Sequence, residues 1–503
     1  MSIRTTLCAV GVAALLVSAC GGSDDPAAEE SSAEAANAAS TSESETVSAD
    51  GTALFDASVV HDLELSYVQE DYDAMIATLA DTGEKEWIEV TVTIDGVTYE
   101  RAGARLKGNS SLAGLSGGFG GGPGGGLAGG DAADRPELPD GAGGAGGRPG
   151  GFGGGGVGGG VSADDPEGLP WLIRLDQFVE GQQHQGYVDI VVRSNNSQTS
   201  LNEAVALDLL REAGLASQEA AHVAFSVNGG DAALRLMIEH PSDDAWQDSS
   251  FADSGALYKA ESTGDWSYRG DDPDSYNDVF DQEGGKKVAD LTPLIDFLQF
   301  INESDDATFA DELADRLDIE SFATYLAMME LVQNFDDIDG PGNNSYLWWD
   351  ASSEQFTVVP WDMNLAFGGL GGGGGFGGGG FPPGGAPDGA PANGEIPEGF
   401  EPPEDGDLPE GFAPPEGFEQ GRGGAGGFGR SNTLVERFHA NDEFEALYQQ
   451  QLDDLEASLF ESGTAEQLLA DRASVLTEQA TALVDAATVE QEANSIAESM
   501  RRQ

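Results

Sequence analysis

The most regular pattern in this chain is the alternation of apolar and polar residues over positions 87–107, WIEVTVTIDGVTYERAGARLK. Asp95-Gly96 interrupts the alternation, and this pair favours a two-residue turn because both residue types tolerate positive φ angles. The stretch therefore predicts a β-hairpin. A second hairpin is predicted in residues 222–240, and a third strand pair with a polar turn in residues 344–362.

A helical pattern follows two further strand candidates, LPWLIRLDQF and YVDIVVRSNN. In residues 200–215, Leu201, Val205 and Leu209 share one face, and Gly214 stands where a glycine commonly ends a helix. This segment predicts an amphipathic helix. The other predicted segments are helices at 291–302 and 319–335, helical acidic sequence from Leu434 to the end, and a polar loop at 263–285.

Glycine is concentrated in two long segments, about 112–162 and about 368–430. Their repeated glycines match Gly-x-Gly-x-x-Gly by chance, and so flexible a backbone loses too much chain entropy to preorganise a phosphate-binding loop. We therefore predict long disordered insertions here rather than a nucleotide loop. The predicted fold class is α+β, with one domain over residues 53–460 that contains both insertions and a helical extension over residues 461–503.

The first 19 residues have the pattern of a secretory signal, in which Arg4 precedes a short apolar run that ends just before Cys20. The pattern predicts a lipoprotein signal peptide, cleaved so that the thiol of Cys20 carries a lipid. The Ala/Ser/Glu-rich residues 20–52 predict a disordered tether. We expect an extracytoplasmic protein anchored in the cell envelope, in the outer membrane if the cell is Gram-negative. An ordinary signal peptide with a chance cysteine is the alternative.

The formal net charge is −68, from 90 acidic and 22 basic residues. Such a field repels phosphate backbones and argues against nucleic-acid binding, while it suits cations and basic partners. A solvated acidic surface produces the same composition. The chain contains no Gly-x-Ser-x-Gly, His-Glu-x-x-His or Walker A motif, and its five histidines form no ligand-spaced cluster. Nothing in the sequence therefore supports a serine or zinc hydrolase.

Acidic and amide residues gather where the helix predicted at 319–335 ends, in QNFDDIDGPGNNSYLWWD. A strand pair follows, and its second strand ends at Asp362 in Pro-Trp-Asp. Protein kinases present the same order: an Asp beside the acceptor hydroxyl, then an Asn and a second Asp that hold Mg²⁺ through oxygen ligands. The N-terminal half, predicted as strands plus one amphipathic helix, matches the rest of that order. A solvated turn is the competing interpretation of the acidic loop.

Five motifs in this order resemble the CotH (spore-coat protein H) family of atypical kinases: RLKGNSS, REAGL, LYKAE, NFD…NNSYLW and PWDMNLAFG. The resemblance covers about residues 53–111, 168–368 and 431–460. It implies an atypical two-lobed, protein-kinase-like fold. It also implies ATP with Mg²⁺, or with Mn²⁺ or Ca²⁺, as cofactors, and phosphorylation of Ser or Thr on secreted or surface proteins.

The resemblance also assigns roles to residues after the long helix. Asp336, in Asn-Phe-Asp, matches the family's base or acceptor-positioning aspartate. Asn343 and Asn344 match its paired asparagines, one of which is expected to hold metal, and Asp362 matches the metal aspartate of Pro-Trp-Asp. The family frequently has a further Asp two residues on, where this chain has Asn364, so a weaker second metal contact is expected.

Lysine is scarce, and two of the five lysines, Lys107 and Lys259, lie inside the family motifs. We expect both to contact phosphate. Asn109 and Ser110 lie in the turn after Lys107, where backbone amides are expected to face the same phosphate.

Three charged residues complete the predicted nucleotide site. Glu203, on the amphipathic helix, is the candidate partner of a phosphate-binding cation, and Arg174 is the rival of Lys107 for that cationic role. Glu239 ends a predicted strand where a hinge would lie, and structural capping accounts for it equally well.

Two other functions stay open. Some fungal relatives are regarded as host-binding adhesins, so a non-catalytic surface protein is one alternative. A calcium-binding acidic module is the other, with GDDPDSYNDVFD as its best segment, although this fits no EF-hand spacing. For a kinase, the acidic chain favours a basic, Ser-rich secreted or surface protein as substrate, with membrane contact through the lipid anchor only.

Overall fold

The computed structural model describes residues 52–108, 110–112, 115, 161–262, 264–340, 343–368 and 432–501. All of these belong to one compact unit, Glu45–Gln503. The predicted signal peptide with Cys20, nearly all of the tether and nearly all of both Gly-rich segments lie outside the described residues.

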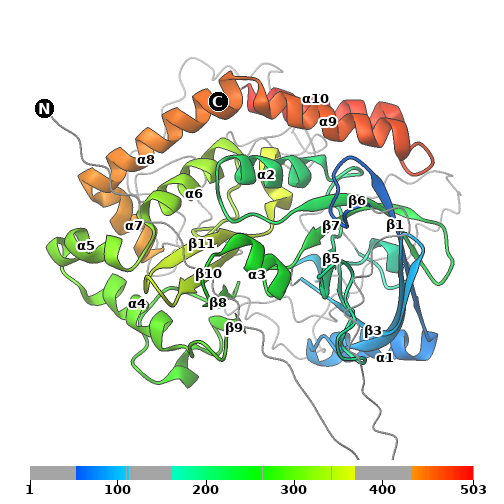
Figure 1. Cartoon of the computed structure of the whole chain (residues 1–503), viewed down its shortest axis with the longest axis horizontal. Coiled ribbons are helices and arrows are strands. Elements are labelled where there is room, and N and C mark those ends of the chain that lie inside the picture. Colours follow the sequence, from blue (N-terminus) through cyan, green and yellow to red (C-terminus); the bar gives the residue numbers. More distant parts are fainter. Residues whose placement is uncertain are drawn as a thin grey trace, which may run out of the picture. The chain divides into compact units, whose positions relative to one another are not determined.

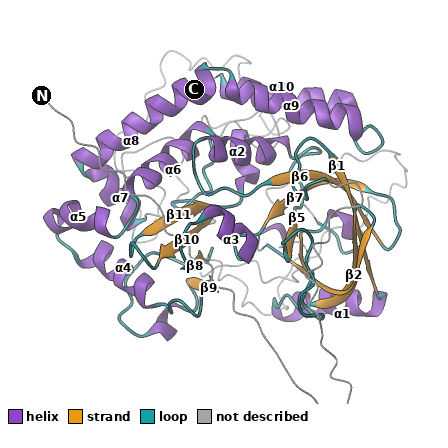
Figure 2. Ribbon diagram, viewed as in Figure 1, coloured by secondary structure: helices purple, strands orange, loops and turns teal. Residues whose placement is uncertain are grey.

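The first half of the unit is a closed barrel of seven strands in the order β1-β2-β3-β4-β5-β7-β6 (Figures 1 and 2). A parallel pairing of β1 with β6 closes it, with Val60 opposite His222. Closure leaves no strand edge for association with other chains. The strands are β1 (Val60–Tyr67), β2 (Ile88–Ile94), β3 (Val97–Leu106), β4 (Trp171–Arg174), β5 (Asp189–Val192), β6 (Ala220–Val227) and β7 (Ala233–Glu239).

Both hairpins predicted in this half are confirmed. β2 pairs antiparallel with β3, and the turn residues Asp95 and Gly96 have φ angles of 47° and 82°. Two successive positive φ angles give the turn that matches the twist of a hairpin. β6 and β7 form the second hairpin, in which Asn228 and Gly229 also have positive φ angles.

Two helices accompany the barrel, α1 (Gln69–Thr82) and α2 (Leu201–Glu212). The prediction of a helix at α2 is confirmed, and Gly214 follows its C-cap with a φ angle of 83°. An amphipathic helix was expected, but every residue of α2 from Leu201 to Leu210 is buried. The polar face is covered because helices from the C-terminal end of the chain lie against it.

A second sheet has four strands in the order β11-β10-β8-β9. The predicted strand pair at its edge is confirmed as the antiparallel β10–β11 hairpin. β9 corrects the loop predicted at 263–285: it pairs with β8, and its first residue, Phe280, is buried. An edge strand needs few apolar residues, so its local sequence did not reveal it. The strands are β8 (Gly255–Ala260), β9 (Phe280–Gly284), β10 (Ser345–Asp350) and β11 (Phe356–Pro360).

Helices surround the second sheet. The two helices predicted before the acidic loop are confirmed as α4 and α6, and the C-terminal part is helical as expected. In the described part of the chain, none of these helices has the length and apolar character needed to cross a membrane. The helices are α3 (Asp244–Ser250), α4 (Thr292–Glu303), α5 (Asp306–Glu312), α6 (Ile319–Leu331), α7 (Thr433–Ala440), α8 (Asp442–Leu455), α9 (Thr464–Gln479) and α10 (Ala486–Met500).

The predicted α+β class is therefore confirmed, whereas the seven-stranded barrel was not expected. Closure depends on the pairing of β1 with β6, which are far apart in the sequence. Local periodicity carries no information about such a pairing. A two-lobed, kinase-like fold is a more specific expectation than the α+β class, and it remains a prediction.

Candidate active site

The β10–β11 hairpin brings the predicted metal-binding residues to one end of the second sheet. Ser345 pairs with Pro360, so Asn343 and Asn344, just before β10, lie at the same end of the hairpin as Asp362, just after β11. Asp362 has a φ angle of 63°, in a region that Asp tolerates better than most residues. Its side chain is 27% exposed.

Arg193 joins Asp362 to the barrel. It follows β5 directly, and its Nε lies 2.9 Å from Oε1 of Glu203 on α2. Its Nη2 donates to Oδ1 of Asp362. The guanidinium fork suits such bridging because one planar group presents several donors. The Glu203–Arg193–Asp362 network therefore connects α2, the barrel and the second sheet.

Burial and charge act against each other in this network. Burial raises the pKa of Glu203 to about 6, although Arg193 opposes that shift. Burial also acts to lower the pKa of Arg193, but the charges of Asp362 and Glu203 outweigh it and raise the pKa above its usual value. Arg193 is therefore positively charged at every physiological pH.

Sequence reasoning missed Arg193. It named Lys107 and Arg174 as the candidate cations, whereas Glu203 pairs with Arg193. Arg174 instead donates from Nε to Oδ1 of the buried Asp189 at 2.7 Å. The overlooked signal was positional: in protein kinases the phosphate-binding lysine lies on the strand that precedes the helix carrying its Glu partner. Here β5 precedes α2, and Arg193 ends YVDIVVR.

Lys107 and Lys259 contribute to a group of basic side chains beside this network. Lys107 lies over the ring of Trp361 at 5.2 Å, and Lys259 over the ring of Tyr346 at 5.3 Å. Burial, together with Lys259, Arg105 and Lys85, lowers the pKa of Lys107 to about 8, although Glu283 opposes the shift. Three of the chain's five lysines thus converge in a protein with a net charge of −68.

Some buried polar atoms beside these cations make no hydrogen bond within the described residues. They include Nε of Arg105 and Nε2 of His240, although Nε2 of His240 lies 3.9 Å from Oε2 of Glu283. Burial, with Lys107 and Arg174, lowers the pKa of His240 well below its usual value, so this imidazole is neutral. A group of mutually repelling cations that only Glu283 opposes among the charges acting on Lys107 fits a ligand that carries several negative charges.

The turn after Lys107 is described only in part. The backbone N–H of Lys107 donates to the carbonyl of Pro170 at 3.0 Å, and Gly108 has a φ angle of 116°. Asn109 lies outside the described residues. Ser110 begins a short helical turn, Ser110–Leu112, and its side chain is not described.

The two asparagines before β10 have different surroundings. Oδ1 of Asn343 accepts from Nε1 of Trp266 at 3.0 Å, and its Nδ2 donates to the carbonyl of Glu261 at 3.0 Å. Asn344 donates from Nδ2 to the carbonyl of Asp336 at 3.0 Å, and no described residue donates a hydrogen bond to its Oδ1. Asn343 is thus held by structural contacts, while Asn344 keeps an acceptor oxygen for a cation.

Two carboxylates of the acidic loop accept hydrogen bonds that fix the loop. Asp337 accepts from the N–H of Asp339 at 3.0 Å, and Asp339 accepts from the N–H of Asn432 at 2.8 Å. Burial raises the pKa of Asp337 to about 6 and that of Asp339 to about 7. These two side chains hold the loop together. Asp336 is partly exposed, and its carbonyl is the one that Asn344 contacts.

Glu239 lies at the end of β7 in a buried polar contact. Its Oε2 accepts from the backbone N–H of Glu219 at 2.7 Å. Burial raises the pKa of Glu239 to about 7, although hydrogen bonds from Glu219 and Tyr187 oppose the shift. These contacts agree with structural capping and do not involve the Arg193 network.

The pKa of Glu239 leads to a prediction about stability. The folded-state pKa is above that of an unfolded Glu, so the stabilising contribution is complete below about pH 4.5 and is lost as the pH rises through 7. The free energy of unfolding is expected to fall between pH 5 and pH 8 as Glu239 loses its proton. One such group contributes up to about 1.4 kcal/mol per pH unit. Glu239→Gln cannot ionise, so we expect this variant to show a smaller fall. Urea denaturation measures this, with the exposed Glu84→Gln as control. An unchanged pH dependence in Glu239→Gln would contradict the assignment.

The residues at the hairpin end fit a divalent metal. The described residues provide no hydrogen bond to Oδ2 of Asp362, and Oδ1 of Asn344 lies at the same end of the sheet. Mg²⁺ is commonly held by one or two carboxylates plus phosphate oxygens and waters. Within the described ranges, no three His, Cys, Asp or Glu side chains cluster as a metal site by themselves. In the segment proposed for calcium, Asp271 and Asp272 make local hydrogen bonds.

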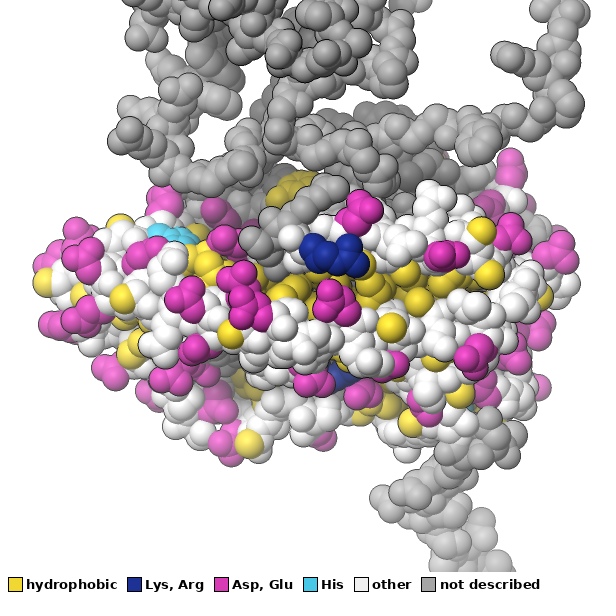
Figure 3. All heavy atoms as spheres, turned by 90° about the horizontal axis from the view of Figure 1, so that it is seen from above, with side chains coloured by type: hydrophobic (Ala, Val, Ile, Leu, Met, Phe, Trp, Pro, Cys, Tyr) yellow, Lys and Arg dark blue, Asp and Glu magenta, His cyan; other side chains and the backbone are white. Residues whose placement is uncertain are grey.

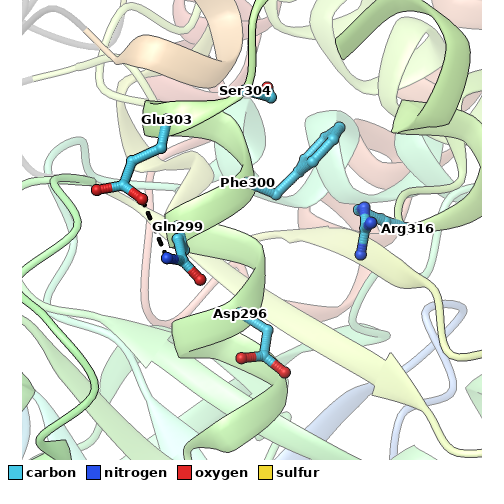
Figure 4. Close-up of a pocket in the computed structure, with 6 residues that line it drawn as sticks. All are labelled: Asp296, Gln299, Phe300, Glu303, Ser304 and Arg316. Carbon is cyan, nitrogen blue, oxygen red and sulfur yellow. Dashed lines mark hydrogen bonds between the residues drawn. The ribbon is translucent and has the colours of Figure 1, made fainter. Parts of the chain in front are cut away.

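Two shallow cavities lie elsewhere, along α4. One of about 390 Å³ is lined by Asp296, Phe300 and Arg316, among others (Figure 4). Arg316 lies over the ring of Phe300 at 4.5 Å, and Gln299 donates to Glu303 at 3.0 Å. The second, of about 380 Å³, shares Asp296 and Arg316. Neither cavity is lined by a residue predicted for the active site. We therefore place the candidate active site at the Arg193 network.

Comparison with known proteins agrees with the motifs. A search of the curated proteins finds no match. The family described as CotH kinase protein matches residues 160–483. The match includes α2, Arg193, the acidic loop and the β10–β11 hairpin, which together carry the network described above. The chain therefore belongs to the CotH kinase protein family.

Proposed function

We propose that this protein is an atypical protein kinase that transfers the γ-phosphate of ATP to Ser or Thr residues of extracytoplasmic proteins. The observation that carries this proposal is the Glu203–Arg193–Asp362 network. In protein kinases, a cation on the strand before a helix pairs with a Glu on that helix, and an Asp after a hairpin holds metal. The same relation between elements is present here, with Arg in place of Lys.

The residues of the site suggest different roles in binding ATP and metal. Arg193, Lys107 and Lys259 would bind the phosphates. Asp362 and Asn344 would hold Mg²⁺, which when bound neutralises charge that develops on the phosphates. Because Arg193 occupies Oδ1 of Asp362, the other carboxylate oxygen is the one assigned to the metal.

Asp336 is assigned to the acceptor. The Oγ of a substrate Ser or Thr forms a bond to the γ-phosphorus, while the bond from that phosphorus to the β,γ-bridging oxygen of ATP breaks. The proton of the hydroxyl passes to the Asp336 carboxylate, and ADP leaves. Partial exposure of Asp336 suits a group that must reach a protein substrate.

The surface supports a preference for basic substrates. Figure 3 shows acidic side chains spread over the face seen from above α8, α9 and α10, with few basic ones among them. A net charge of −68 speeds association with cationic proteins, and salt weakens that effect. We propose basic, Ser-rich secreted or surface proteins as substrates. Lipidation of Cys20 would keep the enzyme in the cell envelope.

The test uses the purified full chain with labelled ATP, Mg²⁺ and two Ser peptides, one basic and one acidic. We expect label on the basic peptide, less on the acidic one, and a smaller difference at high salt. ATP with Mg²⁺ should also raise the melting temperature. A protein that neither transfers label nor gains stability from ATP with Mg²⁺ would instead fit a non-catalytic surface protein.

A further inference from the structure

Helix α2, which carries Glu203, depends on another element for its N-terminus. The N-cap residue, Ser200, has a φ angle of 52° and makes no side-chain cap. Backbone N–H groups at the start of a helix need acceptors from outside the helix. Thr199 supplies one of them, because its Oγ1 accepts from the N–H of Leu201, the first residue of α2, at 3.2 Å. Glu492 of α10 in turn holds the segment just before the helix: its carboxylate accepts from the N–H of Gln198 at 2.9 Å and of Thr199 at 3.1 Å. The hydroxyl of Thr199 donates to it as well.

The neighbouring helix α9 holds the other part of α2. Nε of Arg472 donates to Oδ2 of Asp208 at 2.8 Å, and its Nη2 donates to Oδ1 at 2.8 Å. Nη1 donates to the carbonyl of Ala220 on β6 at 2.8 Å. Both side chains are almost completely buried. Glu203 thus lies between two points at which the C-terminal helices fix α2.

The same helices reach the acidic loop. The hydroxyl of Ser499 on α10 donates to Oε1 of Gln333 at 2.7 Å, and Nε2 of Gln333 donates back to the carbonyl of Ser499 at 3.2 Å. Gln333 has a φ angle of 54° and lies three residues before Asp336. Figure 1 shows α9 and α10 running across α2. The family match ends at residue 483, before α10 begins.

We infer that α9 and α10 position α2 for catalysis, and that Glu492 is a positioning residue that acts through Glu203. The inference rests on the proposed function, because it concerns the phosphate-binding network of the kinase. Glu492 touches no residue of that network directly. Its carboxylate sets where α2 begins, α2 sets where Glu203 lies, and Glu203 orients the guanidinium of Arg193.

Double-mutant kinetics test this inference. We expect Glu492→Ala to lower kcat about tenfold, as when an outer contact that orients a functional group is removed. The KM for the peptide should be unchanged, and amide hydrogen exchange in residues 198–204 should be faster. Glu492→Gln keeps one acceptor oxygen and should lose less activity. Glu490→Ala, on the exposed side of α10, should match the wild type.

The decisive comparison is made in the Glu203→Gln background. If Glu492 acts through Glu203, adding Glu492→Ala to Glu203→Gln should cause little further loss. An equal tenfold loss in both backgrounds, or an active wild type that Glu492→Ala leaves unaffected, would overturn the inference. A wild type that transfers no phosphate would refute the proposed function itself, which is a different result.

Discussion

Replacing Asp362 with asparagine is expected to reduce phosphate transfer by about 1,000-fold or more, with little loss of stability. The change keeps the shape of the side chain and an oxygen that can accept from Arg193, the contact seen at Oδ1. It removes the negative charge that a divalent cation requires. Transfer of label from ATP to a Ser peptide measures the effect, and a melting experiment shows that the variant is folded.

A matched control lies in the same hairpin. Asp350 ends β10 at the opposite end of the hairpin, where it accepts hydrogen bonds from the turn residues Ser352 and Ser353. Asn is well tolerated in such turns, so Asp350→Asn should retain wild-type activity. If Asp362→Asn is as active as Asp350→Asn, the metal assignment is wrong.

Loss of Arg193 is expected to affect both activity and stability. Arg193→Ala should lower transfer by about 100- to 1,000-fold, because a phosphate-binding cation and its orientation are lost together. It also leaves Glu203, whose side chain is 2% exposed, as a buried charge without its partner. Breaking such a buried pair costs about 3–5 kcal/mol.

The pH dependence of that destabilisation can be predicted as well. Arg193 lowers the pKa of Glu203, so its removal raises that pKa further above the value in the unfolded chain. A raised carboxyl pKa means that the folded state binds its proton more tightly, and stability falls as the pH rises. Arg193→Ala should therefore be destabilised more at pH 8 than at pH 5, as urea denaturation measures.

Two further variants separate charge from geometry. Arg193→Lys keeps the charge, but a single ammonium lacks the planar fork that reaches two carboxylates, so activity between the wild type and Arg193→Ala is expected. Arg101→Ala removes an exposed arginine that pairs with Glu89, and it should change neither activity nor stability measurably. Wild-type activity of Arg193→Ala would assign the cationic role to Lys107 or Lys259.

Much of the local structure was predictable because short-range chemistry determines it. Asp95-Gly96 gave the β2–β3 turn, since two residues that tolerate positive φ angles leave few other conformations. The apolar spacing of α2 and α6 predicted both helices. β9 was missed because its strand character comes from pairing with β8 and not from its own residues.

The candidate site was predicted in part. Asp336, Asn343, Asn344 and Asp362 were proposed from the sequence because they lie in contiguous motifs around one hairpin, and the structure places the last three at one end of that hairpin. Arg193 was missed because it lies outside the motifs: its position on the strand before α2 was overlooked, and its second partner, Asp362, is far away in the sequence. The hydrogen bonds of Asn343 favour Asn344 as the metal ligand. The sequence could not indicate this choice, because the two residues are identical and adjacent.

The sequence alone determined the turns, most helices, the order of the motifs and the family, because each depends on neighbouring residues or on their order. Only the tertiary structure decided barrel closure, the contact of Arg193 with Asp362 and the burial of α2 on all sides. These features depend on contacts between distant segments, such as Arg472 with Asp208 and Glu492 with Thr199. A buried charge is costly without a partner, and a local pattern of apolar and polar residues does not encode which distant residue becomes that partner.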